Sequence, residues 1–304
     1  MKSRFDCDDV GEPEEYIGCK TEFDEKNGTL TLTQPVLIQS FVDEFDLPTE
    51  KFDTPAAAGT VLVSGEEPLP IEQQQQYRKG VGKLLHLMRW TRPDVCNATR
   101  EISRFGGQAS AAHMKAMLRI MKYCVDTKHR GITFRPFGSW NGRDQDFEFE
   151  IEGLSDSDYA KDPLTRRSVN GWLVKLNGAV VTCKSKMMPV VALSVTEAEL
   201  YSATCCVQDM LHTKRLIESM GLKVKTPMKI KVDNKGAKDL MNNWSVSGRT
   251  RHIEVKQYFI RDLKDEGLLE VEWIPTEEMT ADIFTKNLPT PLFQKHAAVL
   301  LGDP

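Results

Sequence analysis

Apolar residues at helical spacing dominate the first half of the chain. On this pattern, segments 73–90, 93–105 and 111–127 are predicted to be helices. Before them, Asn27 and Gly28 stand between two strand-like runs, an arrangement typical of a β-hairpin. We therefore predict a hairpin that is followed by a small helical region.

The pattern changes after "GSWNGRDQD" at 138–146, where we place a domain boundary. Residues 146–155 alternate between polar and apolar, which predicts a strand with one buried face. Residues 168–185 contain two further strand-like runs around the turn signal Asn177-Gly178. Three antiparallel strands therefore come in succession.

The remaining elements alternate between helices and strands. We predict a long helix, a short strand, a helix, a strand and a last helix over 194–220, 227–233, 251–267, 268–275 and 277–288. This order predicts an α/β fold, a mixed sheet with three antiparallel strands first and flanking helices. We therefore expect two regions, residues 1–140 and 146–290, and a tail, residues 291–304.

Composition places few limits on function. A chain of 304 residues is long enough for one large or two modest domains. The net charge of −4 argues weakly against nucleic-acid binding, although a local basic patch can be sufficient. The seven cysteines form no CxxC pair, so neither a zinc site nor a disulfide framework is indicated. We expect reduced thiols in an intracellular, cytoplasmic protein, with a virus-like particle or the nucleus as alternative locations. With no apolar run of roughly 18 residues, we expect no membrane association.

Several carboxylates stand where predicted elements begin or end. Asp156 ends the first strand of the second half, Asp233 ends the fourth, and Asp282 lies near the start of the last helix. Glu197 and Glu199 lie in the first turns of the long helix. Clustered carboxylates repel one another, so a cluster of this kind usually holds a divalent cation.

Each of these acids also has a structural interpretation. Glu197 completes an S-x-x-E capping box, which favours a structural role for it. The helix macrodipole favours acids in first turns and by itself accounts for Glu199 and Asp282. Asp158 and Asp162 lie in a polar turn and are expected to be solvated.

Five motifs of the second half resemble, in order, the ribonuclease H domain of copia-type LTR retrotransposon Pol polyproteins. They are "GLSDSDYAKDPLTRRSVNGWLVKLNG", "VALSVTEAELYSA", "VDNKGAKDL", "RTRHIEVKQYFIRD" and "TEEMTADIFTKNL". Upstream, "YIGCKTEFDEKNGTLTLTQPVLIQSFVDEF" is similar to the segment after the reverse transcriptase palm, and "YRKGVGKLLHLMRWTRPDVCNATREISRF" to the thumb and connection. The resemblance implies that 1–140 is a palm remnant with thumb and connection, and 146–290 a ribonuclease H-like domain.

The resemblance implies a reaction. In this family an Asp-Glu-Asp-Asp set binds two Mg²⁺ ions, for which Mn²⁺ can substitute, and cleaves the RNA strand of an RNA–DNA hybrid. Carried over by motif, the set is Asp156, Glu199, Asp233 and Asp282. One metal would activate a water and the other would stabilise the leaving 3′ oxygen.

The basic residues near these motifs are candidates for contacts with phosphates. Contacts to 2′-hydroxyls would distinguish RNA from DNA. The four candidates are Lys184, Lys186, Arg249 and Arg251. A further expected partner is the remainder of a reverse transcriptase polyprotein.

The chain departs from the family pattern in three places. The Tyr-x-Asp-Asp polymerase motif is absent, and "CDDV" at 7–10 aligns with a later segment, so no DNA synthesis is expected. Cys183 and Met188 stand where the family usually has Trp and Gln. Thr276 and Glu277 occupy the stretch where many cellular ribonucleases H carry a histidine.

Two other hypotheses remain. The chain could be a non-catalytic nucleic-acid-binding remnant of a reverse transcriptase polyprotein, since it lacks the polymerase palm. A nuclease of the DDE transposase or integrase type is disfavoured, because those enzymes place the glutamate last. Here Glu199 lies between Asp156 and Asp233.

Overall fold

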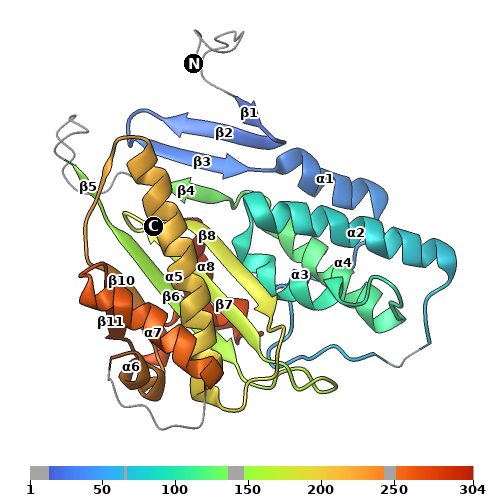
Figure 1. Ribbon diagram of the computed structural model, residues 1–304. Helices are drawn as coiled ribbons and strands as arrows, with labels where there is room; N and C mark the ends of the chain where they lie inside the picture. Colours follow the sequence, from blue (N-terminus) through green and yellow to red (C-terminus); the bar gives the residue numbers. More distant parts are fainter. Residues whose placement is uncertain (1–13, 65–66, 136–146, 243–250, 304) are drawn as a thin grey trace, which may run out of the picture.

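A five-stranded mixed sheet of order β11-β10-β6-β7-β8 lies at the centre of the protein (Figure 1). The computed structural model describes residues 14–64, 67–135, 147–242 and 251–303. The strands are β6 (Ile151–Asp158), β7 (Val169–Leu176), β8 (Ala179–Met187), β10 (Met228–Val232) and β11 (Leu269–Trp273). The first three are antiparallel neighbours, whereas β10 is parallel to both β6 and β11. The prediction of a ribonuclease H-like mixed sheet with three antiparallel strands first is confirmed.

Strand β6 is covered on both faces over most of its length, although its alternation predicted a single buried face. The buried stretch, 153–157, carries small and polar side chains as well as Leu154. Two glycines permit this close packing. A Cβ on Gly153 would lie 2.5 Å from Met210 Sδ, and one on Gly171 of the neighbouring strand 2.7 Å from Thr285 Cγ2. A side chain at Gly171 would also meet the Ala281 carbonyl oxygen at 2.9 Å and would displace η4, whereas one at Gly153 would force the side chains of Met210 and Cys206 to shift.

One face of the sheet is covered by helix α5 (Val195–Ser219), with α6 (Lys235–Asn242) and α7 (Arg251–Asp265) beside it (Figure 1). The start of α5 has the predicted cap. Glu197 N donates to Ser194 Oγ at 3.1 Å, and Leu193 N donates to Glu197 Oε2 at 2.7 Å. Glu197 is therefore a capping residue. No helix within the described ranges is long and apolar enough to cross a bilayer.

The opposite face carries the short 3₁₀ helix η4 (Thr280–Phe284) and helix α8 (Thr290–Leu301). The single helix predicted over 277–288 is absent. Instead, Met279, with ψ of 87°, separates η4 from η3 (Thr276–Glu278), because this value of ψ cannot continue a helix. The segment 291–304, predicted to be a tail, contains most of α8, whose Phe293, Ala297 and Leu300 are buried at helical spacing.

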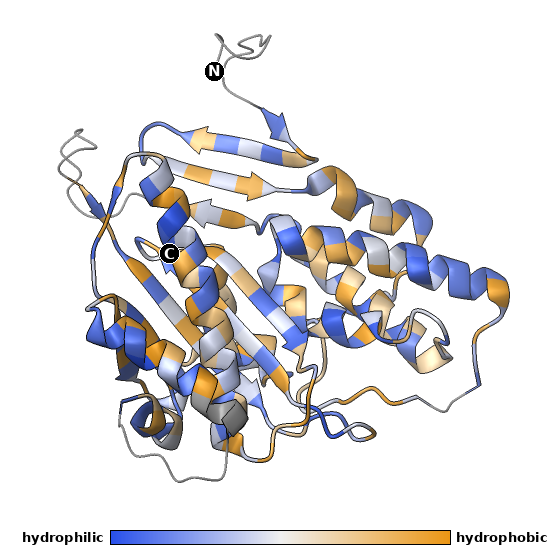
Figure 2. Cartoon of the chain, viewed as in Figure 1, coloured by the Kyte–Doolittle hydropathy of each residue, from blue (hydrophilic) through white to orange (hydrophobic). Residues whose placement is uncertain are grey.

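The first half contains a four-stranded sheet of order β1-β2-β3-β4 and a group of helices. The strands are β1 (Glu15–Tyr16), β2 (Cys19–Asp24), β3 (Thr29–Thr33) and β4 (Ile132–Phe134). Hydrophobic and hydrophilic residues alternate along β3 (Figure 2). The predicted hairpin joins β2 to β3, with Gly28 at φ +61° in the turn. The strand β4, which sequence analysis did not predict, pairs with β3.

Helices occupy the three helical segments predicted for the first half. They are α2 (Ile71–Trp90), the 3₁₀ helix η1 (Pro93–Val95) followed by α3 (Cys96–Ser103), and α4 (Ala111–Asp126), and a further helix, α1 (Pro35–Glu44), precedes them. A further pair of short parallel strands, β5 (Glu148–Phe149) and β9 (Lys223–Val224), lies in the second half.

The two halves share one hydrophobic cluster. Apolar side chains of α1–α4 pack together with Leu154 and Leu173 of the sheet and Phe284 of η4. Across the same interface, Arg104 forms an ion pair with Asp162. The Asp162 side chain is 1% exposed, so the expectation that it is solvated was wrong. The boundary predicted at 138–146 lies outside the described residues, and the division into domains remains a prediction.

Candidate metal centre

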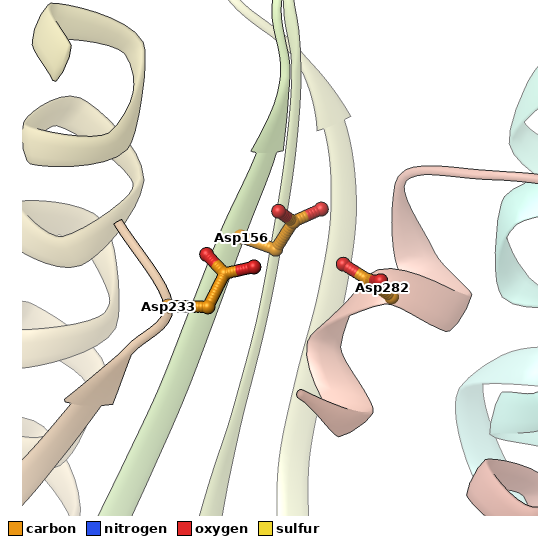
Figure 3. Close-up of side chains that lie close together, drawn as sticks. All are labelled: Asp156, Asp233 and Asp282. Atoms are coloured by element: carbon orange, nitrogen blue, oxygen red, sulfur yellow. The ribbon is translucent and has the colours of Figure 1, made fainter. Parts of the chain in front are cut away.

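Three of the four predicted acids converge at one end of the sheet. Asp156, Asp233 and Asp282 each offer a carboxylate oxygen, and these oxygens lie within 4.8 Å of one another (Figure 3). The register of the sheet explains the first two. Lys231 of β10 is level with Leu154 of β6, so two residues further on Asp233 comes level with Asp156. The residue after the carboxyl end of β10 thereby lies level with a residue two positions before the end of β6.

The packing of η4 brings in the third acid. Asp282 lies in η4, and Ala281 and Phe284 of the same turn pack closely over Gly171, the partner of Asp156 in the sheet. Thr285 then donates its hydroxyl to Asp156 Oδ2. Asp156 and Asp282 are each 2% exposed. The turn therefore buries two carboxylates against each other, which is unfavourable unless a cation or a proton compensates.

Glu199 lies beside this group and is hydrogen-bonded to Ser157, the residue that follows Asp156 on β6. Its Oε1 accepts hydrogen bonds from the Ser157 hydroxyl at 2.9 Å and from the Ser157 amide at 3.2 Å. Its Oε2 is buried and has no hydrogen-bond partner among the described residues. Glu199 is therefore next to Asp156, with one lone carboxylate oxygen, but it is not part of the group of three.

Sequence analysis did not assign three polar residues to the site that the structure places there. Lys286 Nζ lies 3.0 Å from Asp282 Oδ1 and 3.4 Å from Asp156 Oδ1. Thr276 donates its hydroxyl to Asp233 Oδ2 at 2.9 Å, and Thr285 donates to Asp156. The signal for Lys286 was its i+4 spacing from Asp282, which places two side chains on one face of a helical turn. Thr276 lies in the stretch where many cellular ribonucleases H carry a histidine, and sequence analysis gave it no role.

Burial and the repulsion between carboxylates raise the pKa of Asp282, Asp233 and Glu199. Burial, followed by the charge of Asp156, raises the pKa of Asp282 to about 7. The same two causes raise the pKa of Asp233, and they raise that of Glu199 well above its ordinary value against the opposing bonds from Ser157. Burial lowers the pKa of Lys286, but the charges of Asp156 and Asp282 outweigh it and raise that pKa. The site therefore holds more negative charge than its own residues neutralise.

The donor set fits a hard divalent cation. All four acids supply oxygen, the ligand that Mg²⁺ prefers. The lone Oε2 of Glu199 is a buried acceptor without a donor, and such an atom is costly unless a cation or water binds it. Asp156, Asp233 and Asp282 could hold one cation between them, with Glu199 adjacent.

Of the other predicted residues, the structure describes the side chains of Lys184 and Lys186. Lys184 and Lys186 lie on β8, two strands from β6, and Lys186 Nζ lies 5.9 Å from the centre of the Trp172 ring. Arg251 begins α7, but its side chain, Arg249 and the segment 7–10 are outside the described residues.

The two departures on and after β8 are accommodated by packing. Cys183 packs against the shared hydrophobic cluster, and burial raises its pKa well above the ordinary value. Met188 is 1% exposed and packs with Ala192 and Ala198. Both residues therefore pack in the interior of the protein.

Comparison with known proteins identifies the family. No protein-family model matches the chain. It is 30% identical over 300 residues to the retrovirus-related Pol polyprotein from transposon TNT 1-94 of Nicotiana tabacum, a match that covers 97% of this chain and 22% of that protein. With the Pol polyprotein from transposon RE1 of Arabidopsis thaliana it shares 28% over 298 residues, 98% of this chain and 20% of that protein. The chain is a homologue of copia-type retrotransposon Pol polyproteins.

This Pol homologue spans about one fifth of the length of those two relatives. It is also 35% identical over 133 residues to the secreted RxLR effector protein 161 of Plasmopara viticola, which covers 44% of this chain and 87% of that protein. Among solved structures, the N-terminal RNase H domain of Rv2228c from Mycobacterium tuberculosis aligns with 49% of this chain and 97% of that chain, at 15% identity and a TM-score of 0.34. LC11-RNase H1 in complex with an RNA/DNA hybrid aligns with 45% and 94%, at 16% identity and a TM-score of 0.35. The description of the fold therefore rests on the strand order.

Proposed function

We propose that the chain is a retroelement-type ribonuclease H that hydrolyses the RNA strand of RNA–DNA hybrids with two Mg²⁺ ions and has no polymerase site of its own. The observation that carries the proposal is the convergence of Asp156, Asp233 and Asp282, three acids far apart in the sequence, with Glu199 adjacent. These four acids occur in the chain in the order of the family's Asp-Glu-Asp-Asp set.

The four acids would hold the metal, and their neighbours set their orientation. Bound Mg²⁺ supplies an activated water and positive charge for the developing negative charge at phosphorus. Ser157 holds Glu199 through two hydrogen bonds, and a hydroxyl from Thr276 fixes Asp233. These bonds align carboxylate oxygens before a cation arrives, which reduces the reorganisation that binding requires. Asp282, with a pKa of about 7, holds a proton in part of the metal-free molecules and releases it as its oxygen takes a cation.

Recognition of the hybrid is assigned to basic residues outside the carboxylate group. The candidates for phosphate contacts remain Lys184, Lys186, Arg249 and Arg251. Contacts to 2′-hydroxyls would select the RNA strand. The remainder of a Pol polyprotein is the second proposed partner, because the relatives are about five times as long as the matched region.

The decisive test is cleavage by the purified chain of a hybrid labelled on each strand, with DNA duplex and RNA duplex as comparisons. With Mg²⁺ or Mn²⁺ we expect cleavage of the RNA strand of the hybrid alone. Asp156→Asn should reduce the rate at least about 100-fold, since loss of even an outer-shell partner of a metal site costs 10–100-fold. Asp158→Asn is the matched control, because Asp158 lies two residues along the same strand and pairs with Lys161 at 2.7 Å.

A hybrid that stays intact with pure protein and metal would contradict the proposal. If the hybrid is bound without cleavage, and Asp233→Asn does not change that binding, the chain is a non-catalytic nucleic-acid-binding remnant instead. Equal cleavage by wild type and Asp156→Asn would place the activity elsewhere or in a contaminant.

A further inference from the structure

Lys286 supplies the positive charge at the carboxylate cluster. Its Nζ lies 3.0 Å from Asp282 Oδ1 and 3.4 Å from both oxygens of Asp156. In the part of the chain that the structure describes, no other lysine, arginine or histidine forms an ion pair with Asp156, Asp233, Asp282 or Glu199. One ammonium therefore contacts two of the four carboxyl groups, those of Asp156 and Asp282.

The ammonium reaches the cluster from its open side. The side chain of Lys286 is 36% exposed, whereas those of Asp156 and Asp282 are 2% and 4% exposed. The backbone of Lys286 is held separately, since its amide donates to the Asp282 carbonyl oxygen at 2.9 Å. The side chain can therefore rotate into solvent while the backbone, η4 and the two acids stay in place.

A divalent cation and this ammonium would compete for the same oxygens. Asp156 and Asp282 belong to the group whose oxygens lie within 4.8 Å of one another, and Lys286 occupies oxygens of both. Two positive charges at this separation in a partly buried site repel each other strongly. Simultaneous occupation is therefore unfavourable, and one of them must leave.

We propose that Lys286 is a displaceable counter-ion of the metal centre: its ammonium neutralises Asp156 and Asp282 in the metal-free protein and leaves them when a divalent cation binds. The inference rests on the metal site of the proposed function and adds a positioning residue to it. Two consequences follow. Lys286 stabilises the metal-free fold, and it weakens metal binding by the free energy needed to displace it.

The test measures metal binding and stability directly, without nucleic acid. Mn²⁺ binding to the full chain is measured by titration calorimetry, and thermal unfolding is followed in EDTA. We expect Lys286→Met to bind Mn²⁺ about five- to ten-fold more tightly, because the cation no longer has to displace a partly exposed ion pair. This change in affinity corresponds to a free energy of about 1 kcal/mol for that ion pair. The same variant should unfold at a lower temperature in EDTA and regain the difference in saturating Mn²⁺.

Two further variants separate charge from packing. Lys286→Arg keeps the positive charge and should keep both the stability in EDTA and the Mn²⁺ affinity of the wild type. Lys229→Met is the matched control, because Lys229 forms an ion pair with Glu272 at 2.6 Å on another part of the sheet. It should leave Mn²⁺ affinity unchanged. If Lys286→Met does not fold without metal, a retained fold in Mn²⁺ together with a folded Lys286→Arg supports the same conclusion.

The inference and the proposed function can fail independently. Mn²⁺ affinity that is unchanged or weaker in Lys286→Met overturns the counter-ion role, whether or not the wild type cleaves hybrids. Tighter Mn²⁺ binding by Lys286→Met, in a protein that leaves hybrids intact, supports the counter-ion role and removes the nuclease. A wild type that binds no Mn²⁺ removes both.

Discussion

The hydroxyl of Ser157 donates a hydrogen bond to Glu199 Oε1 over 2.9 Å, and the amide of the same residue donates another over 3.2 Å. Ser157 directly follows Asp156 on β6, so the strand that carries one acid of the site also orients a second. This relationship joins α5 to the sheet at the candidate metal centre. It also allows a direct test of whether the orientation of Glu199 affects metal binding.

Ser157→Ala should weaken metal binding while the fold is retained. The change removes one of the two donors to Glu199, and loss of an outer-shell hydrogen bond lowers metal affinity about 10- to 100-fold. Calorimetry with Mn²⁺ measures the effect. Ser155→Ala is the control, since Ser155 is also fully buried on β6, on the same face, and its hydroxyl has no hydrogen-bond partner among the described residues. Equal affinities of the two variants would show that the hydroxyl bond from Ser157 to Glu199 does not contribute to metal binding.

Asp282 should make the metal-free protein less stable as the pH rises. Its pKa is raised from 3.8 to about 7 in the fold, first by burial and then by Asp156, so between these values the folded state binds more protons than the unfolded state. The stabilisation is present in acid and is lost as the pH rises through about 7. Urea unfolding without metal, at pH 5 and pH 8, measures this slope, and Asp282→Asn should flatten it. A slope that is unchanged in the variant would contradict the assignment.

His296 should act in the opposite direction. Burial lowers its pKa from 6.5 to about 4, and the positive charge of Lys295 adds to the effect. Between these values the unfolded state binds the extra proton, so stability falls as the pH drops from 6.5 towards 4. His296→Leu should reduce this acid sensitivity in urea unfolding at pH 7 and pH 5. The same substitution at the exposed His86 on α2 should leave it intact; an identical response of both variants would argue against burial as the cause.

Asn287 should be important for the contact between the two halves. Its amide nitrogen donates to the Thr60 carbonyl oxygen at 2.8 Å and to Glu101 Oε2 at 2.9 Å, and its amide oxygen accepts from Asn97 at 2.8 Å. Asn287→Ala should lower the free energy of unfolding by about 2–3 kcal/mol, because three hydrogen bonds are lost and one of them involves a charged group. Urea unfolding measures this.

The exposed Gln39 makes one hydrogen bond, to Asp43 of its own helix, so Gln39→Ala should change stability by less than about 0.5 kcal/mol. A loss at Asn287 that is no larger than this would mean that the interface tolerates removal of its central amide. Because Asn287 directly follows Lys286, the Mn²⁺ affinity of Asn287→Ala also shows whether the helical half supports the metal centre.

Local patterns were sufficient for most elements. The hairpin at Asn27-Gly28, the strands around Asn177-Gly178 and the cap at Glu197 each follow from interactions between residues a few positions apart. A strand or a capped helix depends mainly on such neighbours, so the sequence by itself determined the order of elements. It also placed the acids near the ends of those elements, which is why they could be proposed as a set.

The tertiary structure alone decided how those elements meet. The level position of Asp156 and Asp233 depends on the register between β6 and β10, and the approach of Asp282 depends on η4 packing against Gly171. The ammonium of Lys286 at the carboxylates likewise depends on that packing. These contacts join residues far apart in the chain, and local propensity carries no information about them.

Burial also reversed two local expectations. Asp162 lies in a polar turn, but its ion pair with Arg104 is formed by the packing of α3 against the sheet. The segment 291–304 lacks a strong amphipathic signal of its own, yet α8 is ordered because the shared hydrophobic cluster receives Phe293 and Leu300. Sequence determined which side chains were available, whereas the packing of distant segments decided which became buried, paired or charged, since desolvation depends on everything that surrounds a group.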